Sequence, residues 1–320
     1  MQGIVLGGTN NFFAVECDDG KERICSIKGK KLKSDKEYYN PLAPGDYVLL
    51  DHDELDDEKG QITGILPRKN KFVRWNVKGR CPQLLAANLD NLILVTTPDA
   101  PPFRPRFIDR ILAQAEYEKL TTTIVCNKYD LMEAADIDFQ NRLSIWEKLG
   151  YRVLRISAKT GDGLPNLAKL LENKRSAFVG QSGVGKSSLL NVLDNTCVLK
   201  TGSLSKKYGK GSHTTTKGML MHLHLNEALM GGLHGCRADV IDTPGIRRFV
   251  LHDIPEEDLQ LYFREFSPLV GQCSFGMSCR HHTEPGCKIL EAVYSGVISE
   301  ERYESWQRIC NEIKTDSWQD

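Results

Sequence analysis

The feature that most constrains the fold is a glycine-rich segment at residues 180–187, GQSGVGKS, which matches the pattern Gly-x4-Gly-Lys-Ser. An apolar stretch at 177–179 precedes it and a helix-compatible run at 188–193 follows it, so the segment joins a strand to a helix. In that setting backbone N–H groups surround phosphate oxygens, Lys186 reaches the β- and γ-phosphates, and the Ser187 hydroxyl binds Mg²⁺. The residues predicted to hold the phosphates are Gly180, Gln181, Ser182, Gly183, Val184, Gly185, Lys186, Ser187 and Ser188.

Around this segment, residues 89–250 alternate between short apolar runs and amphipathic runs, which is typical of a doubly wound α/β domain with a parallel sheet. The predicted strands are 92–96, 122–126, 151–156, 175–179 and 237–241. The predicted helices are 106–119, 138–149, 164–172 and 186–194. After residue 249 the chain becomes helical, and we expect helices over 254–266 and 300–313.

The first 68 residues show short apolar runs separated by turn signals such as Asp18-Asp19-Gly20. The runs are 3–6, 11–17, 23–27, 46–50 and 60–66. They suit a small barrel of the OB type, and an SH3-like barrel is the alternative because strand count does not separate the two. Residues 69–88 are expected to form a basic, irregular connector. We therefore expect a multidomain chain with an OB-type barrel at 1–68, an α/β domain at 69–250 and a helical domain at 251–320.

The composition is that of an ordinary globular protein, with 40% hydrophobic and 26% charged residues. Lys and Arg total 42 and Asp and Glu total 42, so the formal net charge is zero. This balance excludes a protein that coats nucleic acid over its whole surface, and it leaves room only for local basic patches. No apolar run approaches the roughly 18 residues needed to cross a bilayer, and the start has no secretory pattern. We expect a cytoplasmic protein with no membrane partner.

A four-residue motif, Asn127-Lys128-Tyr129-Asp130, directly follows the predicted strand at 122–126. It resembles the guanine-specificity motif of GTPases, in which the Asp carboxylate accepts hydrogen bonds from guanine N1–H and the 2-amino group. Adenine offers neither donor and leaves that acceptor unpaired, at a cost of about 1–3 kcal/mol. Ser157-Ala158-Lys159 follows the next strand and resembles the companion loop, where the Ala158 N–H meets guanine O6. The two loops together predict GTP or GDP as the ligand.

Three cysteines and one histidine lie within 15 residues of each other near the C-terminus: Cys273, Cys279, His281 and Cys287. We call these four residues the Cys/His cluster. Four nitrogen and sulfur ligands suit a closed, tetrahedral, structural Zn²⁺ site. His282 is an alternative imidazole ligand, and unliganded thiols are the alternative to a metal. The other cysteines of the ten in the chain are scattered, which is typical of reduced thiols.

A further motif, Asp242-Thr243-Pro244-Gly245, follows the predicted strand at 237–241 and resembles the D-x-x-G switch loop of GTPases. In that role Asp242 holds Mg²⁺ through water and the Gly245 N–H meets the γ-phosphate. The motifs run in the order base loop, companion loop, phosphate loop, switch, whereas Ras-like GTPases place the phosphate loop first. The chain therefore resembles a circularly permuted P-loop GTPase. With a barrel before it and the Cys/His cluster after it, nearly the whole chain is similar to the ribosome small-subunit-dependent GTPase family (RsgA, also called YjeQ).

The resemblance assigns residues 201–217, a polar stretch rich in Gly and Ser, to a first switch loop. The family's Gly-x-His-Thr-Thr-Thr pattern lies at 211–216, with Ser212 where Arg is often found. It implies Thr214 or Thr215 as a Mg²⁺ ligand when the γ-phosphate is present, and both remain candidates. The family usually has four residues between the first two cysteines of the cluster, and this chain has five.

Local charge indicates RNA binding, because residues 21–36 carry seven basic and two acidic side chains. A second basic run, with Phe72 and Trp75 interleaved, consists of Arg68, Lys69, Lys71, Arg74, Lys78 and Arg80. A third lies in the first switch and comprises Lys200, Lys206, Lys207, Lys210 and Lys217. OB barrels bind single strands through basic grooves and aromatic platforms. The resemblance implies the 30S subunit and its 16S rRNA as partners, and without an oligomerisation signal we expect a monomer.

Hydrolysis needs a group that orients the attacking water. Ras-like proteins use a Gln directly after D-x-x-G, but Ile246 stands there and cannot hydrogen-bond water. His213 is the internal candidate for this role, with Lys186 on the phosphates. We expect a GTP hydrolase that acts in late maturation of the 30S subunit and is released on hydrolysis. The alternatives are an RNA-binding adaptor with vestigial nucleotide binding, which Ile246 favours, and an ATP-dependent kinase, with which residues 127–130 are poorly compatible.

Overall fold

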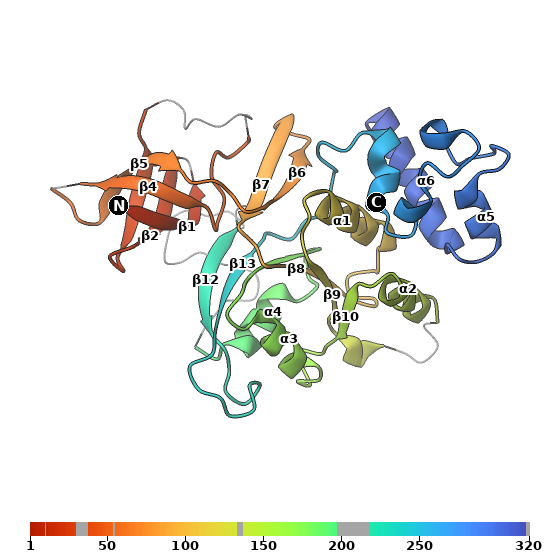
Figure 1. Cartoon of the computed structure of the whole chain (residues 1–320). Coiled ribbons are helices and arrows are strands. Elements are labelled where there is room, and N and C mark those ends of the chain that lie inside the picture. Colours follow the sequence, from red (N-terminus) through yellow and green to blue (C-terminus); the bar gives the residue numbers. More distant parts are fainter. Residues whose placement is uncertain (10, 30–37, 54, 133–136, 197–217, 318–320) are drawn as a thin grey trace.

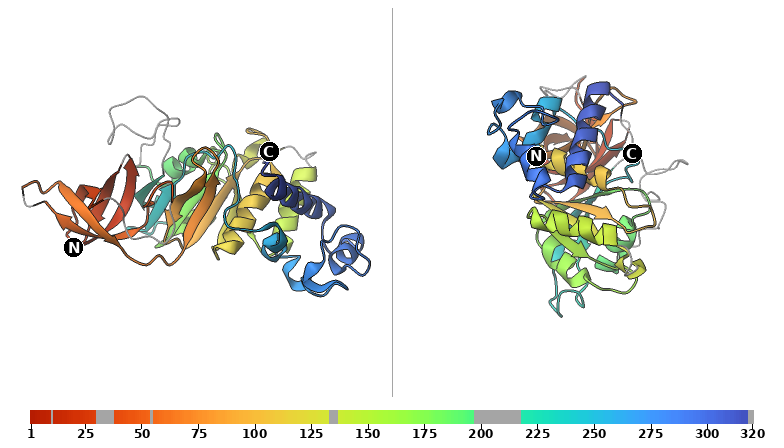
Figure 2. Two further views of the ribbon diagram at one scale, coloured as in Figure 1. Left: turned by 90° about the horizontal axis from the view of Figure 1, so that it is seen from above. Right: turned by 90° about the vertical axis from the view of Figure 1, so that its right-hand side faces the viewer.

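The computed structural model describes residues 1–9, 11–29, 38–53, 55–132, 137–196 and 218–317 (Figure 1). Three regions follow one another along an elongated molecule: a β-barrel at the N-terminal end, a sheet with helices in the middle, and a helical region that carries the C-terminus (Figures 1 and 2). No helix in the described ranges is both long enough and apolar enough to span a membrane.

The described strands of the N-terminal region form a closed barrel in the order β1-β2-β3-β5-β4. They are β1 (Gln2–Thr9), β2 (Phe12–Cys17), β3 (Glu22–Ile27), β4 (Tyr47–His52) and β5 (Lys59–Ile65). Val15, Cys25 and Ile62 alternate with more exposed neighbours and are fully buried, as a strand period of two requires. β3 pairs with β5 in parallel, while the other pairs are antiparallel. The predicted OB-type barrel is confirmed.

Residues 69–88 are not an irregular connector, because they contain a hairpin of β6 (Lys71–Asn76) and β7 (Cys81–Ala87). The prediction was wrong because charged and polar residues, such as Arg74 in β6 and Gln83 in β7, interrupt the apolar ones and hide the strand pattern. Phe72 and Val73 are fully buried, and the Phe72 ring stacks on Phe249 with centroids 5.5 Å apart. The hairpin lies between the barrel and the helices of the middle region (Figure 1).

The described strands of the middle region form a six-stranded sheet in the order β10-β9-β8-β11-β13-β12. They are β8 (Asn91–Thr96), β9 (Thr122–Cys126), β10 (Arg152–Arg155), β11 (Arg175–Gly180), β12 (Met219–His224) and β13 (Arg237–Asp242). All neighbouring pairs are parallel except β12, which runs antiparallel to β13 at the edge. The predicted strands are confirmed, and β12 is an addition that the sequence reasoning missed.

Helices cover both faces of this sheet, as a doubly wound fold requires. They are α1 (Pro105–Tyr117), α2 (Ile137–Lys148), α3 (Leu164–Leu171) and α4 (Lys186–Leu193). Along β8, Leu92 and Leu94 share a core with α1 and α2, whereas Ile93 and Val95 share a core with α3 and α4. Side chains therefore alternate between two packed layers, and the four central residues of β8 are all apolar for that reason.

The C-terminal region consists of short helices around the Cys/His cluster. They are the 3₁₀ helices η2 (Glu256–Tyr262), η3 (Ser267–Leu269) and η4 (Gly276–Ser278), and the α-helices α5 (Lys288–Tyr294) and α6 (Glu300–Thr315). The helix expected over 254–266 is wrong in type and length, because Phe263 adopts an extended conformation with φ −103° and ψ 110°. Beyond that break, the Phe263 ring lies under the Arg302 guanidinium. The Arg302 Cζ atom is 4.3 Å from the centroid of the Phe263 ring. The helix expected over 300–313 is confirmed as α6.

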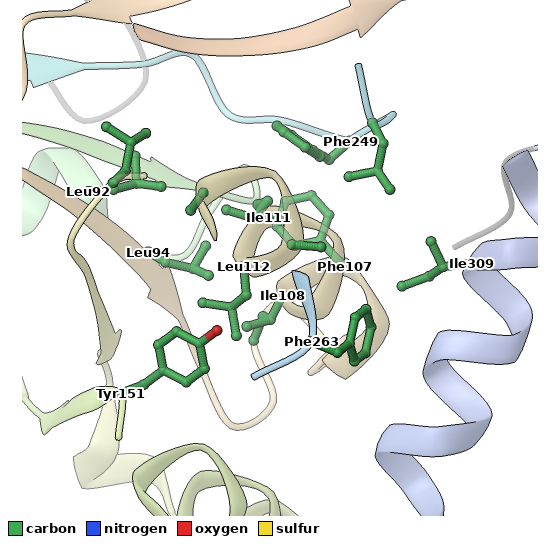
Figure 3. Close-up of a cluster of buried hydrophobic side chains, with 14 of the residues drawn as sticks. Leu92, Leu94, Phe107, Ile108, Ile111, Leu112, Tyr151, Phe249, Phe263 and Ile309 are labelled. Atoms are coloured by element: carbon green, nitrogen blue, oxygen red, sulfur yellow. The ribbon is translucent and has the colours of Figure 1, made fainter. Parts of the chain in front are cut away.

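A single hydrophobic core joins the sheet to the C-terminal region. Figure 3 shows Ile108, Ile111 and Leu112 of α1 between sheet residues on one side and Phe249 and Phe263 on the other. The same cluster of buried side chains also contains Ile309 of α6. Because α1 begins shortly after β8 and packs against α6, the C-terminal region is held against the six-stranded sheet by a shared core.

Candidate nucleotide site and metal centre

The phosphate loop, residues 180–187, joins β11 to α4 at the carboxyl edge of the sheet. Gly183 and Gly185 have φ angles of +87° and +91°, which residues with side chains rarely adopt. A Cβ atom at Gly185 would also come within 2.4 Å of the Asn127 Nδ2 atom. The loop therefore follows its tight path only with glycine here, and its N–H groups and the start of α4 form an anion site.

Lys186 is the first residue of α4, and only 7% of it is exposed. Its Nζ atom donates hydrogen bonds to the carbonyl oxygens of Gly180 and Gln181, at 3.1 and 3.3 Å, so the ammonium group lies over the phosphate loop. Burial lowers the pKa of Lys186, and the Asp242 carboxylate opposes that shift. A largely desolvated cation in this place favours an anionic ligand such as a phosphate group.

Asn127 joins the base loop, residues 127–130, to both neighbouring loops. Its Nδ2 atom donates to the Val184 carbonyl oxygen at 2.8 Å, and its Oδ1 atom accepts from the Ala158 N–H at 3.2 Å. The Lys128 Nζ atom donates to the Gly183 carbonyl oxygen at 2.9 Å. Three loops that are far apart in the sequence thus meet at one site, as their positions after parallel strands predict.

Asp130 is exposed at the end of the base loop, where a ligand can reach it. One of its carboxylate oxygens accepts a hydrogen bond from the Ser157 hydroxyl at 2.6 Å. The Ser157 Oγ atom in turn accepts from the Thr160 N–H at 3.0 Å, and the Tyr129 N–H donates to the Ile156 carbonyl oxygen at 3.0 Å. The companion loop therefore orients a carboxylate that is still accessible, which is what reading the two guanine donors requires.

Asp242 ends β13 and carries the clearest sign of a missing partner. It is 9% exposed, and its buried Oδ1 atom has no hydrogen-bond partner in the described part of the chain. Burial raises the pKa of Asp242 to about 6, and the charge on Lys186 opposes the shift. Mg²⁺ prefers oxygen ligands and keeps several waters, so the Asp242 carboxylate and the hydroxyl of Ser187, the residue after Lys186, are donors of the kind that fits this metal.

The second switch, residues 242–245, packs directly on the phosphate loop. A Cβ atom at Gly245 would come within 2.9 Å of the Ser182 backbone nitrogen, and the Ile246 N–H donates to the Gly180 carbonyl oxygen at 3.0 Å. Ile246 is 2% exposed and offers no side-chain group that could orient water. The other candidates for Mg²⁺ and water, His213, Thr214 and Thr215, lie outside the described residues, so their roles stay predictions.

The Cys/His cluster is assembled as the sequence predicts, with all of its ligand atoms within 4.8 Å of one another. The Cys273 and Cys287 sulfurs are 3.9 Å apart, and the His281 Nδ1 atom lies 3.6 and 3.2 Å from them. Zn–S bonds of about 2.3 Å in a tetrahedron place sulfurs roughly 3.8 Å apart. The buried site therefore fits zinc, and the five residues between Cys273 and Cys279 include the 3₁₀ turn η4.

His281, not His282, belongs to the Cys/His cluster. Burial lowers the pKa of His281, which favours the neutral imidazole that a metal needs, and its Nε2 atom contacts the Gln260 Oε1 atom at 2.5 Å. His282 is exposed, and its Nδ1 atom lies 3.3 Å from Gln307. The sequence reasoning missed Gln260, because an isolated Gln outside the cysteine spacing carries no signal. Its contact fixes the ring of His281, as outer partners of metal ligands commonly do.

The fold and the site define the class of protein. The base and companion loops follow β9 and β10, which precede the phosphate-loop strand β11 in the chain, while β13 leads to the second switch. The four motifs still meet at one edge of the sheet. This is a circularly permuted P-loop GTPase, preceded by an OB-type barrel and followed by a Cys/His cluster.

Comparisons with known proteins identify the family. A family model described as "RsgA GTPase" matches residues 65–252. The small ribosomal subunit biogenesis GTPase RsgA of Chlorobaculum tepidum is 39% identical over 321 residues, which cover 98% of both chains. The protein of the same name from Borrelia recurrentis is 37% identical over 97% of this chain and 94% of that protein. The chain belongs to the RsgA GTPase family.

Solved structures agree with this family. The chain is similar to YjeQ from Thermotoga maritima, with a TM-score of 0.72, 33% identity and 98% of each chain covered. It is also similar to YloQ, described as a circularly permuted GTPase, with a TM-score of 0.68, 26% identity, and 98% of this chain and 95% of that chain covered. The likeness extends over the whole chain, and so includes the barrel and the helical region as well as the sheet.

Proposed function

We propose that the chain hydrolyses GTP during late maturation of the small ribosomal subunit. The observation that carries the proposal is the meeting of three features at one site: Asn127, the phosphate loop, and a buried carboxylate oxygen of Asp242 that has no hydrogen-bond partner among the described residues. The names of the relatives, small ribosomal subunit biogenesis GTPases, supply the partner. A protein that acts on ribosomal subunits works in the cytoplasm, bound to 16S rRNA, and we propose that it acts as a monomer.

In the proposed complex, guanine contacts the base loop through Asp130 and the companion loop through Ala158. The phosphates bind to the phosphate loop, from Gly180 to Ser188, with Lys186 on the β- and γ-phosphates. Mg²⁺ supplies charge neutralisation between these phosphates when it is bound. The residues proposed to hold it are Ser187, Asp242 through water, and Thr214 or Thr215. Gly245 donates its N–H to the γ-phosphate.

The chain needs a group that orients the attacking water, because Ile246 is buried and apolar. We propose His213 for this role, since an imidazole can accept a proton or hydrogen-bond a water near neutral pH. The replacement His213→Ala should then lower turnover without weakening GTP binding. Unchanged turnover, both alone and with small subunits, would refute this assignment.

The Cys/His cluster is proposed to hold one structural Zn²⁺ through Cys273, Cys279, His281 and Cys287. Its four protein ligands leave no place for a substrate, so the metal supplies folding energy rather than chemistry. We propose 1–68, 69–250 and 251–320 as the barrel, GTPase and zinc-binding domains. The basic runs of the barrel and of residues 68–80 are the proposed RNA contacts.

Nucleotide-controlled release is tested by sedimentation with purified small subunits. The protein loaded with a non-hydrolysable GTP analogue should sediment with the subunits, and the protein loaded with GDP should stay in the supernatant. A Lys186→Ala variant, which lacks the phosphate contact, serves as the nucleotide-binding control. Equal sedimentation of the two loaded forms would contradict release on hydrolysis.

A second candidate, an RNA-binding adaptor without significant hydrolysis, is favoured only by Ile246. It predicts subunit binding that is the same with GTP, with GDP and without nucleotide. The sedimentation experiment therefore separates it from the GTPase. Membership of a family named for its GTPase activity supports the enzyme.

A further inference from the structure

A groove of about 470 Å³ lies where the barrel meets the amino-terminal edge of the sheet. We call it the junction groove, and its walls include Tyr47, Lys69, Asp90, Lys174, Arg175 and Arg237. Arg175 begins β11 and Arg237 begins β13, whereas the phosphate loop and Asp242 lie at the other ends of these strands. The groove is therefore at the opposite edge of the sheet from the phosphate loop and Asp242.

The carboxylates of the junction groove are already paired. Asp90 accepts hydrogen bonds from the Lys69 Nζ atom and the Arg175 N–H, both at 2.9 Å. Asp239 contacts the His222 Nδ1 atom at 2.7 Å and forms an ion pair with Arg175 at 3.1 Å. The two acidic groups are thus neutralised by cations on the same surface, and they do not offset any further positive charge.

Lys174 and Arg237 are the cations left over. Both are exposed, and neither has an ion pair with any residue that the structure describes. Backbone hydrogen bonds hold their segments side by side: the Asn173 N–H donates to the Arg237 carbonyl oxygen at 2.8 Å, and the Asp239 N–H donates to the Lys174 carbonyl oxygen at 3.0 Å. The groove therefore presents two uncompensated positive charges from adjacent strand starts.

Tyr47, on β4 of the barrel, adds an aromatic surface to these charges. Its side chain is among the exposed hydrophobic groups, at 41%. The Arg175 guanidinium lies over the ring, 5.2 Å from its centroid, and donates a hydrogen bond to the hydroxyl at 3.3 Å. Arg175 is in turn held by Asp239, so the ring has a fixed position beside Lys174 and Arg237.

We propose that the junction groove binds a single-stranded segment of RNA, with backbone phosphates at Lys174 and Arg237 and a base stacked on Tyr47. Cations that follow a backbone beside an aromatic platform are the common arrangement for single strands. An acidic peptide would use the charges but gains little from the ring. The inference rests on the proposed function, because that function makes RNA the partner.

The test compares a double variant, Lys174→Gln with Arg237→Gln, with a matched control, Lys148→Gln with Lys169→Gln. The control residues are exposed lysines on α2 and α3, so both variants lose two charges. Binding of a fluorescein-labelled single-stranded oligoribonucleotide is followed by anisotropy over a range of KCl concentrations. Affinity for a fluorescent GDP analogue checks the fold and should be unchanged in both variants.

Each phosphate contact contributes about 0.7 to the slope of log affinity against log salt for single strands. The groove variant should therefore lose roughly 1.4 of the wild-type slope, and the control variant should keep the slope of the wild type. Tyr47→Ala should weaken binding about tenfold at constant slope, and Tyr47→Phe should restore it because stacking needs only the ring.

Three results would overturn the proposal, and they are distinguishable. A wild-type slope in the groove variant places the RNA elsewhere and leaves the proposed function standing. If polyglutamate binds the wild-type chain but not the groove variant, while the variant still binds RNA, the groove is a site for acidic peptides. If the wild-type chain binds neither the oligoribonucleotide nor small ribosomal subunits, the proposed function itself is refuted.

Discussion

Replacing Asp109 by asparagine is expected to weaken the attachment of the C-terminal region to α1. Asp109 is fully buried in α1 and accepts hydrogen bonds from Arg142 of α2, Arg302 of α6 and the Trp146 Nε1 atom, the last at 3.1 Å. Burial opposes its ionisation, but the Arg302 and Arg142 guanidinium groups outweigh that effect and hold the pKa of Asp109 below its ordinary value. The carboxylate is therefore charged and central to the contact.

The expected loss of stability depends on which ion pairs remain when Asp109 is replaced by asparagine. Asparagine keeps the shape of the side chain but removes the negative charge, so two buried cations lose a partner. Breaking a buried ion pair in this way costs about 3–5 kcal/mol. Arg302 keeps Glu265 and Arg142 keeps Glu301, so we expect the lower end, about 3 kcal/mol.

Urea unfolding of the two proteins, monitored by tryptophan fluorescence, measures this difference. Trp146 donates a hydrogen bond to Asp109, Trp306 lies four residues after Arg302 on α6, and both indoles are buried in the folded chain. Glu304→Gln is the matched control, because it removes an exposed pair with Arg308 on the same α6 helix and should cost less than about 0.5 kcal/mol. If Asp109→Asn costs no more than this control, the buried network does not hold the C-terminal region in place.

Three further predictions concern the other sites. Gly185→Ala should lower GTP affinity at least about tenfold, because its Cβ meets Asn127, whereas Gly232→Ala, with a similar φ but open space, should not. Chelation should remove one zinc per chain and lower the Tm, which metal analysis with calorimetry measures. The hydrogen bond to Asp239 raises the pKa of His222 above its ordinary 6.5. Its stabilisation is therefore fully present below about pH 6.5 and is lost as pH rises through the higher folded pKa, so the Tm gap to His222→Asn should be largest below pH 6.5 and shrink as the pH is raised above it.

The motifs and most elements were predictable because their signals are local. A strand–loop–helix pattern around Gly180 and a buried apolar run before Asn127 depend only on neighbouring residues. Parallel strands then place the loops after β11 and β9 at the same edge of the sheet, so the meeting of the two loops follows from the strand pattern. The cysteine spacing likewise predicted the four members of the cluster.

The remaining features depend on contacts between distant residues, which local patterns do not contain. Phe72 becomes part of a hairpin through its contact with Phe249, and the local sequence around it, with Lys71 and Arg74, does not show this. β12 is half-exposed, and His222 is held there by Asp239 on the next strand. Gln260 reaches the His281 ring across 21 residues of chain. Each of these positions is defined by its partner, not by its own periodicity.

The central claim is that this chain hydrolyses GTP, and we propose that small ribosomal subunits raise the rate because Ile246 cannot orient the attacking water. The most direct measurement is GTP turnover by the wild-type chain with and without purified small subunits, with Lys186→Ala as the matched inactive variant. The account predicts slow turnover alone, an increase of roughly tenfold or more with subunits, and no increase in the variant. Equal turnover with and without subunits, or the same increase in Lys186→Ala, would contradict it.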